Sequence, residues 1–169
     1  MAEILTKFSK PRSDYSVSLL VMGPAELCHK VSEALHESAK ERKWRVIVHK
    51  CESVSDITKI RFNLSIDYII FVFDWRVQSL SEVETNICFI DKHYINCGAV
   101  CMVNCQGITK SIGMASHKST KLRDKYNIRF LCTDISKPQS CIQLGNRILN
   151  LVGAVLGITS GIPIIGFPL

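Results

Sequence analysis

The chain has 169 residues with a formal net charge of +6, and 47% of its residues are hydrophobic. This length and ordinary composition predict one globular domain with a sizeable core and exclude a low-complexity chain. The polar first fourteen residues do not resemble a secretion signal. We therefore expect the eight cysteines to be reduced, mostly buried hydrophobic side chains rather than disulfides or zinc ligands.

Apolar segments with strand character alternate along the chain with segments of helical periodicity. Strands are predicted at residues 16–22, 44–49, 67–74, 99–104 and 129–133, and helices at residues 24–43, from about 81, at 115–126 and from 138. Residues 53–63 fit both a short helix and a strand, and we favour the helix. This alternation predicts an α/β domain with a parallel sheet.

Several helix boundaries follow from local signals. Pro24 is predicted at the first position of the first helix, and Pro138 opens the last one. Ser81 and Glu84 have the spacing of a capping box, which predicts a helix start at Ser81. The apolar stripe of that middle helix is Val83, Ile87, Ile90 and Tyr94. In the last helix, we expect Ile142, Leu149, Val152 and Leu156 to face the sheet.

The loop after the first predicted strand lies where nucleotide-binding α/β proteins carry G-x-x-x-x-G-K-[ST]. Gly23 keeps the first glycine, but Cys28 replaces the second. A side chain there obstructs the approach of backbone N–H groups to phosphate. His29 replaces the permanently charged lysine, and Lys30 replaces the hydroxyl residue that binds magnesium. We predict a degenerate phosphate loop that binds no nucleotide.

The other nucleotide-binding motifs are also incomplete. No glycine lies between Gly23 and Gly98, which rules out D-x-x-G in that interval. The first predicted helix runs almost directly into the second strand, so there is no room for a first switch loop. The base-reading motif N-K-x-D corresponds to NCQG, which keeps Asn104 but has Gly107 in place of the carboxylate. No catalytic residue, cofactor or metal site is expected.

These observations together predict a small-GTPase-like, three-layer α/β/α domain with a mainly parallel sheet that lacks the first switch loop and one strand. We expect a loose lead-in at residues 1–14, the domain at residues 15–158 and an apolar tail at residues 159–169. Glycines and prolines interrupt that apolar end, so no membrane helix is expected. Basic residues gather near residues 40–45 and 110–129. They suit solvated helix faces, and direct nucleic-acid contact stays open.

Four segments with preserved spacing resemble the centromere protein M family. They are LLVMG at 19–23, IDYIIFVFD at 66–74, GAVCMVNCQG at 98–107 and LCTD at 131–134. The resemblance extends from about residue 16 to residue 161. It implies a pseudo-GTPase of the nucleus, located at the centromere and kinetochore, that binds no nucleotide. It also implies centromere proteins I, H and K as partners in the inner-kinetochore network that supports chromosome segregation.

A structural subunit of this kind needs apolar anchors for a helical partner. Our candidate partner-binding residues are Tyr94, Ile95 and Cys97, together with Ile158, Ile162, Ile164 and Ile165. The same side chains could instead close the core of the domain itself. Two other functions also stay open: an atypical nucleotide-binding switch with a rebuilt loop, and a peripheral membrane or trafficking adaptor.

Overall fold

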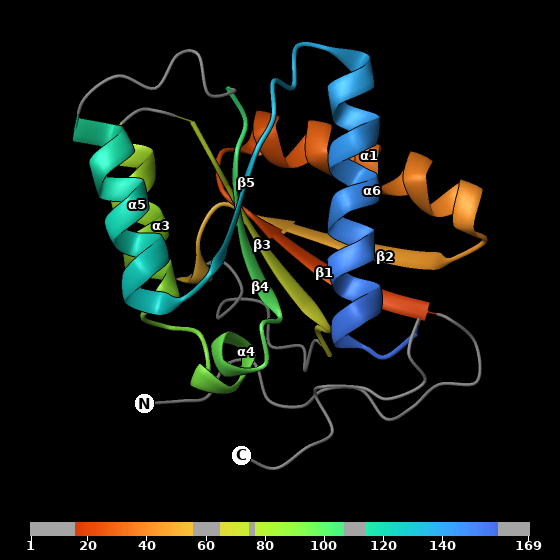
Figure 1. Ribbon diagram of the computed structural model, residues 1–169, viewed down its shortest axis with the longest axis horizontal. Helices are drawn as coiled ribbons and strands as arrows, with labels where there is room; N and C mark the ends of the chain where they lie inside the picture. The colour runs from red at the N-terminus through yellow and green to blue at the C-terminus, as the bar shows by residue number, and fades with distance from the viewer. Residues whose placement is uncertain (1–15, 56–64, 75–76, 107–113, 159–169) are drawn as a thin grey trace.

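The computed structural model describes residues 16–55, 65–74, 77–106 and 114–158 (Figure 1). The expected lead-in, the apolar tail and most of the ambiguous segment 53–63 lie outside these residues. The helices and strands, in chain order, are β1 (Ser16–Met22), α1 (Ala25–Arg42), β2 (Arg45–Cys51), β3 (Tyr68–Phe73), α3 (Val77–Ile87), α4 (Lys92–Asn96), β4 (Val100–Asn104), α5 (Met114–Tyr126), β5 (Arg129–Cys132) and α6 (Pro138–Val155).

The described strands form one five-stranded sheet in the order β2-β1-β3-β4-β5, in which every neighbouring pair is parallel. Helices α1 and α6 pack together on one face, and α3 and α5 pack together on the other (Figure 1). This arrangement confirms the predicted three-layer α/β/α domain. The carboxyl ends of all five strands meet at the same edge of the sheet, which is where ligands bind in folds of this class.

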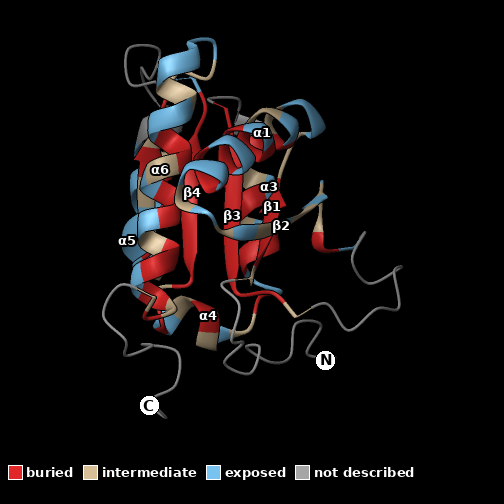
Figure 2. Cartoon of the chain, turned by 90° about the vertical axis from the view of Figure 1, so that its right-hand side faces the viewer, coloured by how far each residue is buried: buried red, intermediate tan, exposed pale blue. Residues whose placement is uncertain are grey.

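The central strands are buried on both faces, as Figure 2 shows. All six residues of β3 are 0% exposed, because helices cover both sides of this near-continuous apolar run. The edge strand β2 instead alternates between exposed and half-buried residues over much of its length. At the start of β3, the buried Asp67 carboxylate accepts a hydrogen bond from the Ser18 backbone N–H at 2.8 Å, which joins β1 to β3.

The connection between α1 and β2 is as short as predicted. Lys43 adopts a left-handed conformation with a φ of 57° and ends the helix. The backbone N–H groups of Lys43 and Trp44 donate to the carbonyls of Lys40 and Ala39, and β2 begins at the next residue. The prediction for Pro24 was one position off, because this residue caps α1 with extended ψ and the helix begins after it.

The middle helix differs from its prediction in its start and its end. Helix α3 begins at Val77 and ends at Ile87, so Ser81 lies inside it and the predicted capping box is wrong. The Ser81 carbonyl accepts a hydrogen bond from Thr85 Oγ1 at 3.0 Å. A separate helix, α4, follows, because the Asp91 carboxylate accepts from the His93 N–H at 2.8 Å and caps a new start.

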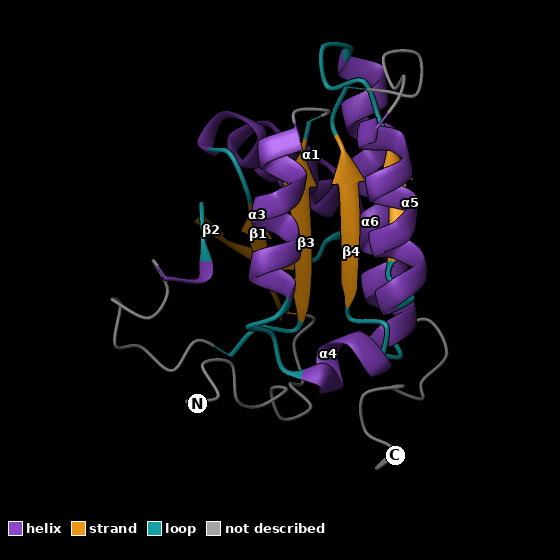
Figure 3. Ribbon diagram, turned by 90° about the vertical axis from the view of Figure 1, so that its left-hand side faces the viewer, coloured by secondary structure: helices purple, strands orange, loops and turns teal. Residues whose placement is uncertain are grey.

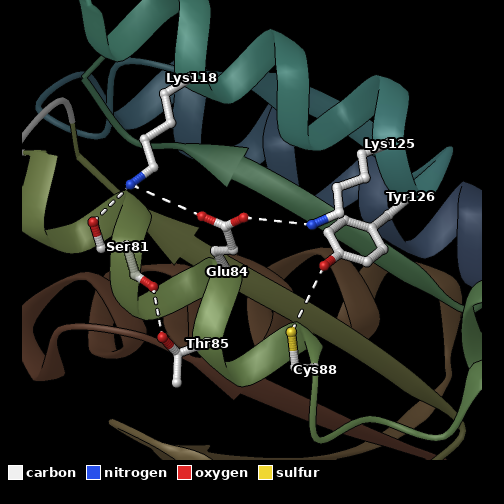
Figure 4. A network of polar contacts seen from close by, with 7 residues as sticks. All are labelled: Ser81, Glu84, Thr85, Cys88, Lys118, Lys125 and Tyr126. Carbon is white, nitrogen blue, oxygen red and sulfur yellow. Dashed lines mark hydrogen bonds and ion pairs between the residues drawn. The ribbon is translucent and has the colours of Figure 1, made fainter.

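Helices α3 and α5 are joined by polar contacts around Glu84 (Figure 4). Lys118 Nζ donates to Ser81 Oγ at 2.7 Å and lies 4.0 Å from the Glu84 carboxylate. Lys125 Nζ lies 3.6 Å from the other Glu84 oxygen. Ser81 therefore contributes its side chain to the contact between two helices instead of to a helix cap.

Helix α6 starts at Pro138 as predicted and packs closely on α1. A Cβ on Gly145 would overlap the Ala34 carbonyl and the Ser38 hydroxyl, so only glycine permits this approach. Ile142 is 45% exposed, which contradicts its predicted position against the sheet. The buried stripe runs through Leu144, and Ile142 lies about 200° around the helix from that residue.

Candidate functional site

Gly23 makes a closed turn where a phosphate loop would be open. Its φ is 147°, and a Cβ there would overlap the Val72 carbonyl oxygen. Its N–H donates to the Cys51 carbonyl at 3.1 Å, which joins the ends of β1 and β2. A phosphate cradle depends on backbone N–H groups that are free to face the ligand. Here this N–H is already engaged within the protein.

The side chain of Cys28 occupies the interior of the same turn. Its sulfur lies 3.2 Å from the Gly23 carbonyl oxygen, 3.7 Å from that of Val21 and 3.9 Å from that of Cys51. Burial raises the pKa of the Cys28 thiol to about 12, and the charge of Glu52 adds to this effect. A neutral thiol surrounded by carbonyl oxygens offers nothing that attracts an anion.

His29 and Lys30 lie on the outer surface of α1. Their side chains are 64% and 41% exposed. His29 Nε2 lies 3.4 Å from Glu33, and Lys30 Nζ lies 3.4 Å from Glu26. These are i,i+4 pairs that span one helical turn. The two residues at the lysine and hydroxyl positions of the motif therefore pair along the helix.

The Asn104 side chain is bonded within the protein at the end of β4. It is 0% exposed, its Oδ1 accepts from the Gln106 N–H at 3.1 Å, and its Nδ2 lies 3.8 Å from Cys132 Sγ. Gly107 lies outside the described residues. Because the Asn104 amide is buried and bonded within the protein, it does not present a base-reading group.

The candidate partner residues fall into three groups. Tyr94 and Cys97 are 2% and 5% exposed, and the Tyr94 hydroxyl donates to the Ile66 carbonyl at 2.8 Å. These two residues therefore belong to the core of the domain. Ile95 and Ile158 are partly buried and pack against the same core. The remaining candidates, Ile162, Ile164 and Ile165, lie outside the described residues.

The degenerate loop and the partner candidates of α4 are at opposite ends of the sheet. Figure 3 shows α4 beyond the end at which β3 and β4 begin, whereas the turn at Gly23 follows the end of β1. A segment that contacts α4 therefore lies at the other end of the sheet from the turn at Gly23.

A groove beside β5 was not predicted from the sequence. It has a volume of about 810 Å³ and is lined by residues of α4, α5, β5 and α6. Arg123, Arg129 and Arg147 lie on its walls. The sequence indicated the first two as part of a basic stretch, but Arg147 lies on a helix eighteen residues further along. Only the fold brings it to the same groove.

The described part of the chain shows neither a candidate metal site nor a candidate membrane span. Within the ranges given above, His, Cys, Asp and Glu side chains form no group that could hold a metal ion. None of the helices that the structure describes combines the length and apolar character that crossing a membrane requires.

Among the solved structures to which the chain is similar is the flavodiiron protein from Giardia intestinalis, at 10% sequence identity and a TM-score of 0.49. The match covers 82% of this chain and 36% of that chain, so this protein spans about a third of the other's length. At this level the likeness carries no conclusion about function. A comparison with curated proteins found no match.

The sequence model of the centromere protein M family matches residues 2–167, which is almost the whole chain. This match agrees with the segments at residues 19–23, 66–74, 98–107 and 131–134. The chain therefore belongs to the centromere protein M (CENP-M) family and is a component of the centromere and kinetochore.

Proposed function

We propose that this protein is a non-catalytic structural subunit of the inner kinetochore, a pseudo-GTPase that stabilises a helical partner and thereby supports kinetochore assembly and chromosome segregation. The proposed partner is centromere protein I, together with centromere proteins H and K. The observation that carries the proposal is the closed turn at Gly23, whose N–H is bonded to the Cys51 carbonyl and whose interior holds the Cys28 thiol.

The closed turn argues against nucleotide chemistry for a physical reason. Phosphate binding would require the Gly23 N–H to leave the Cys51 carbonyl, and it would bring negative charge toward the oxygens that surround the Cys28 sulfur. Each lost hydrogen bond of a buried group costs about 1–3 kcal/mol. The closed turn therefore stabilises this edge of the sheet, and the domain acts as a scaffold.

The partner surface proposed here combines Ile95 of α4 with Ile158 and the apolar tail that follows α6. Ile95 and Ile158 are the two anchors that lie at the surface of the core instead of inside it. A stable interface buries about 1,600 Å² in total around a few apolar anchors. Residues 159–169 contain three more isoleucines and one phenylalanine, which would supply such anchors.

Co-purification with centromere protein I tests this proposal. The doubly substituted chain Ile158→Asp, Ile162→Asp should lose partner binding and keep the melting temperature of the parent chain within a few degrees. Ile142→Asp is the matched control, because Ile142 is an isoleucine of α6 that is 45% exposed and precedes both substituted isoleucines in the chain. Unfolding of the double variant would instead assign both isoleucines to the domain's own core.

A nucleotide-binding switch is the first alternative function. Calorimetric titration with GTP, GDP and ATP in the presence of magnesium decides it. Binding tighter than about 100 μM would contradict the proposal.

A peripheral membrane or trafficking adaptor is the second alternative. It rests on the apolar tail and the net charge of +6. Flotation with liposomes that contain anionic lipid separates it from the proposed subunit, which should stay in the bottom fraction at physiological salt.

A further inference from the structure

We infer that the groove beside β5 binds an extended, acidic segment of a partner protein, which pairs with β5 as a sixth strand of the sheet. This inference deepens the proposed function, because it names the chemistry of a partner segment. Ile95 lines this groove, whereas Ile158 does not.

The edge of β5 that faces away from β4 carries no strand among those that the structure describes. The Thr133 N–H donates to the Asn104 carbonyl of β4 at 2.9 Å, which fixes the direction of alternate residues along β5. In a parallel pair, Thr133 and every second residue before it direct their N–H and C=O groups toward β4, and the residues that alternate with these direct theirs to the opposite side. Phe130 therefore presents its backbone donor and acceptor to the groove, and Cys132 presents its own to the smaller hollow at the end of the strand.

The surroundings of this edge leave room for a chain segment. Strand β5 lies between α5 and α6 (Figure 1), and its residues Arg129, Phe130 and Leu131 line the groove of about 810 Å³. A smaller hollow of about 230 Å³ continues past Cys132 and shares Arg147 with it. Phe130 and Leu151 give the groove an apolar floor, since both pack against the core with part of their surface exposed.

Charge indicates which segment fits. Arg123, Arg129 and Arg147 line the groove from α5, β5 and α6, and all three are exposed. The carboxylate that lines the groove belongs to Asp124, which is paired with Arg123 at 2.9 Å. In the smaller hollow, the Asp134 carboxylate lies 3.9 Å from Lys137 Nζ. The groove lining therefore has two more guanidinium groups than carboxylates, and Arg129 and Arg147 supply them from different elements. Because guanidinium binds carboxylate with two parallel hydrogen bonds, an acidic segment is the complementary partner.

Strand addition explains both features together. Backbone pairing with Phe130 and Cys132 supplies affinity, and alternate side chains of the added strand reach the arginines. A basic side chain on an edge strand also discourages pairing between copies of the same chain, since two arginines would meet. The groove therefore selects an acidic segment from another protein.

Fluorescence anisotropy with the full chain tests the inference. The probe is a labelled short peptide of alternating glutamate and valine, and the comparison probes are its glutamine–valine counterpart and a single-stranded DNA oligonucleotide. We expect the acidic peptide to bind at least about tenfold more tightly than the neutral one. Equal binding of the two peptides, or tighter binding of the oligonucleotide, would overturn the inference.

Variants locate the binding. Arg129→Glu with Arg147→Glu should weaken the acidic peptide at least about tenfold, whereas Lys40→Glu with Lys121→Glu, which makes the same charge change at exposed positions outside the groove, should not. The milder Arg129→Gln, Arg147→Gln pair replaces the first variant where that chain fails to fold. A loss of the same size in the control pair would show general charge attraction and contradict a specific groove.

Hydrogen exchange distinguishes strand addition from contact through side chains alone. The acidic peptide should slow exchange at the amides of Phe130 and Cys132, and leave the Leu131 amide, which faces β4, unchanged. Unaltered exchange at Phe130 and Cys132 with the peptide bound would overturn strand pairing. Neither result depends on whether the Ile158 variant binds centromere protein I, so the two proposals fail independently.

Discussion

The thiol sulfur of Cys28 lies 3.2 Å from the carbonyl oxygen of Gly23, which accepts its hydrogen bond. The two residues stand at the glycine positions between which a phosphate loop would hold its ligand. Cys28 places a neutral group there, since burial raises its pKa to about 12. The Cys28 side chain thereby occupies the space that a nucleotide would need.

Restoring the motif residues should not restore nucleotide binding. The triple variant Cys28→Gly, His29→Lys, Lys30→Ser rebuilds the sequence of the loop, but the Gly23 N–H stays bonded to Cys51, and the magnesium and base motifs are still missing. We expect GTP to bind more weakly than about 100 μM in calorimetry. Tight binding would mean that three side chains alone had abolished the site.

Gly23→Ala should destabilise the fold by more than about 3 kcal/mol, because the added Cβ overlaps the Val72 carbonyl and the φ of 147° is unfavourable for alanine. Gly98→Ala is the matched control, since Gly98 also has a positive φ, at 69°, but open space around its Cβ position. This control should lose only about 1–2 kcal/mol. Urea unfolding measures the loss of stability in both variants. Equal losses would show that the Val72 backbone moves to accommodate the added Cβ.

Gly145→Ala should also destabilise, against the usual preference. Alanine in a helix interior is favoured over glycine by about 1 kcal/mol. Here the Cβ would press on the Ala34 carbonyl and the Ser38 hydroxyl of α1, which costs about 1–3 kcal/mol in a packed interface. Gln143→Ala on the exposed face of α6 is the control and should be neutral. A melting temperature raised by Gly145→Ala would contradict the close packing of α1 on α6.

Stability should decline at alkaline pH. Burial raises the pKa of Cys28, Cys101 and Cys105 from 9.0 to about 12. Below pH 9 these thiols stay protonated in both states, so their stabilisation is complete. Between pH 9 and 12 the unfolded chain loses protons first, and the free energy of unfolding falls by up to about 1.4 kcal/mol per pH unit and thiol.

Urea unfolding between about pH 8 and pH 10 measures this slope, and Cys105→Ala isolates one thiol. The variant should show a shallower decline than the parent chain, whatever its stability at pH 8, because it lacks one proton that the folded state retains. An identical slope would mean that the Cys105 thiol ionises equally in both states.

The sequence allowed the sheet to be predicted because parallel strands buried on both faces, such as β3, are near-continuous apolar runs. The missing switch loop followed from the two residues between α1 and β2. The start of α3 could not be found, since Ser81 and Glu84 fit a capping box locally and their actual contacts come from Lys118 and Lys125 on α5.

The candidate partner residues and the groove could not be placed from the sequence either, because long-range contacts decide which side chains are buried and which lie together. Tyr94 looked like an exposed anchor, but its hydroxyl is bonded to Ile66 inside the core. Ile142 fitted an apolar stripe, although only one face of α6 meets α1 and the sheet. Arg129 and Arg147 face a common groove because α6 returns beside β5. No local spacing contains this information.

The most direct test of a structural, nucleotide-independent subunit is the affinity of this chain for centromere protein I, measured with GTP, with GDP and without nucleotide, each with magnesium. We predict the same dissociation constant in all three conditions, within about twofold. A complex that forms only with one nucleotide, or whose affinity differs by about tenfold between GTP and GDP, would contradict the account. So would the failure of the unmodified chain to bind this partner at all.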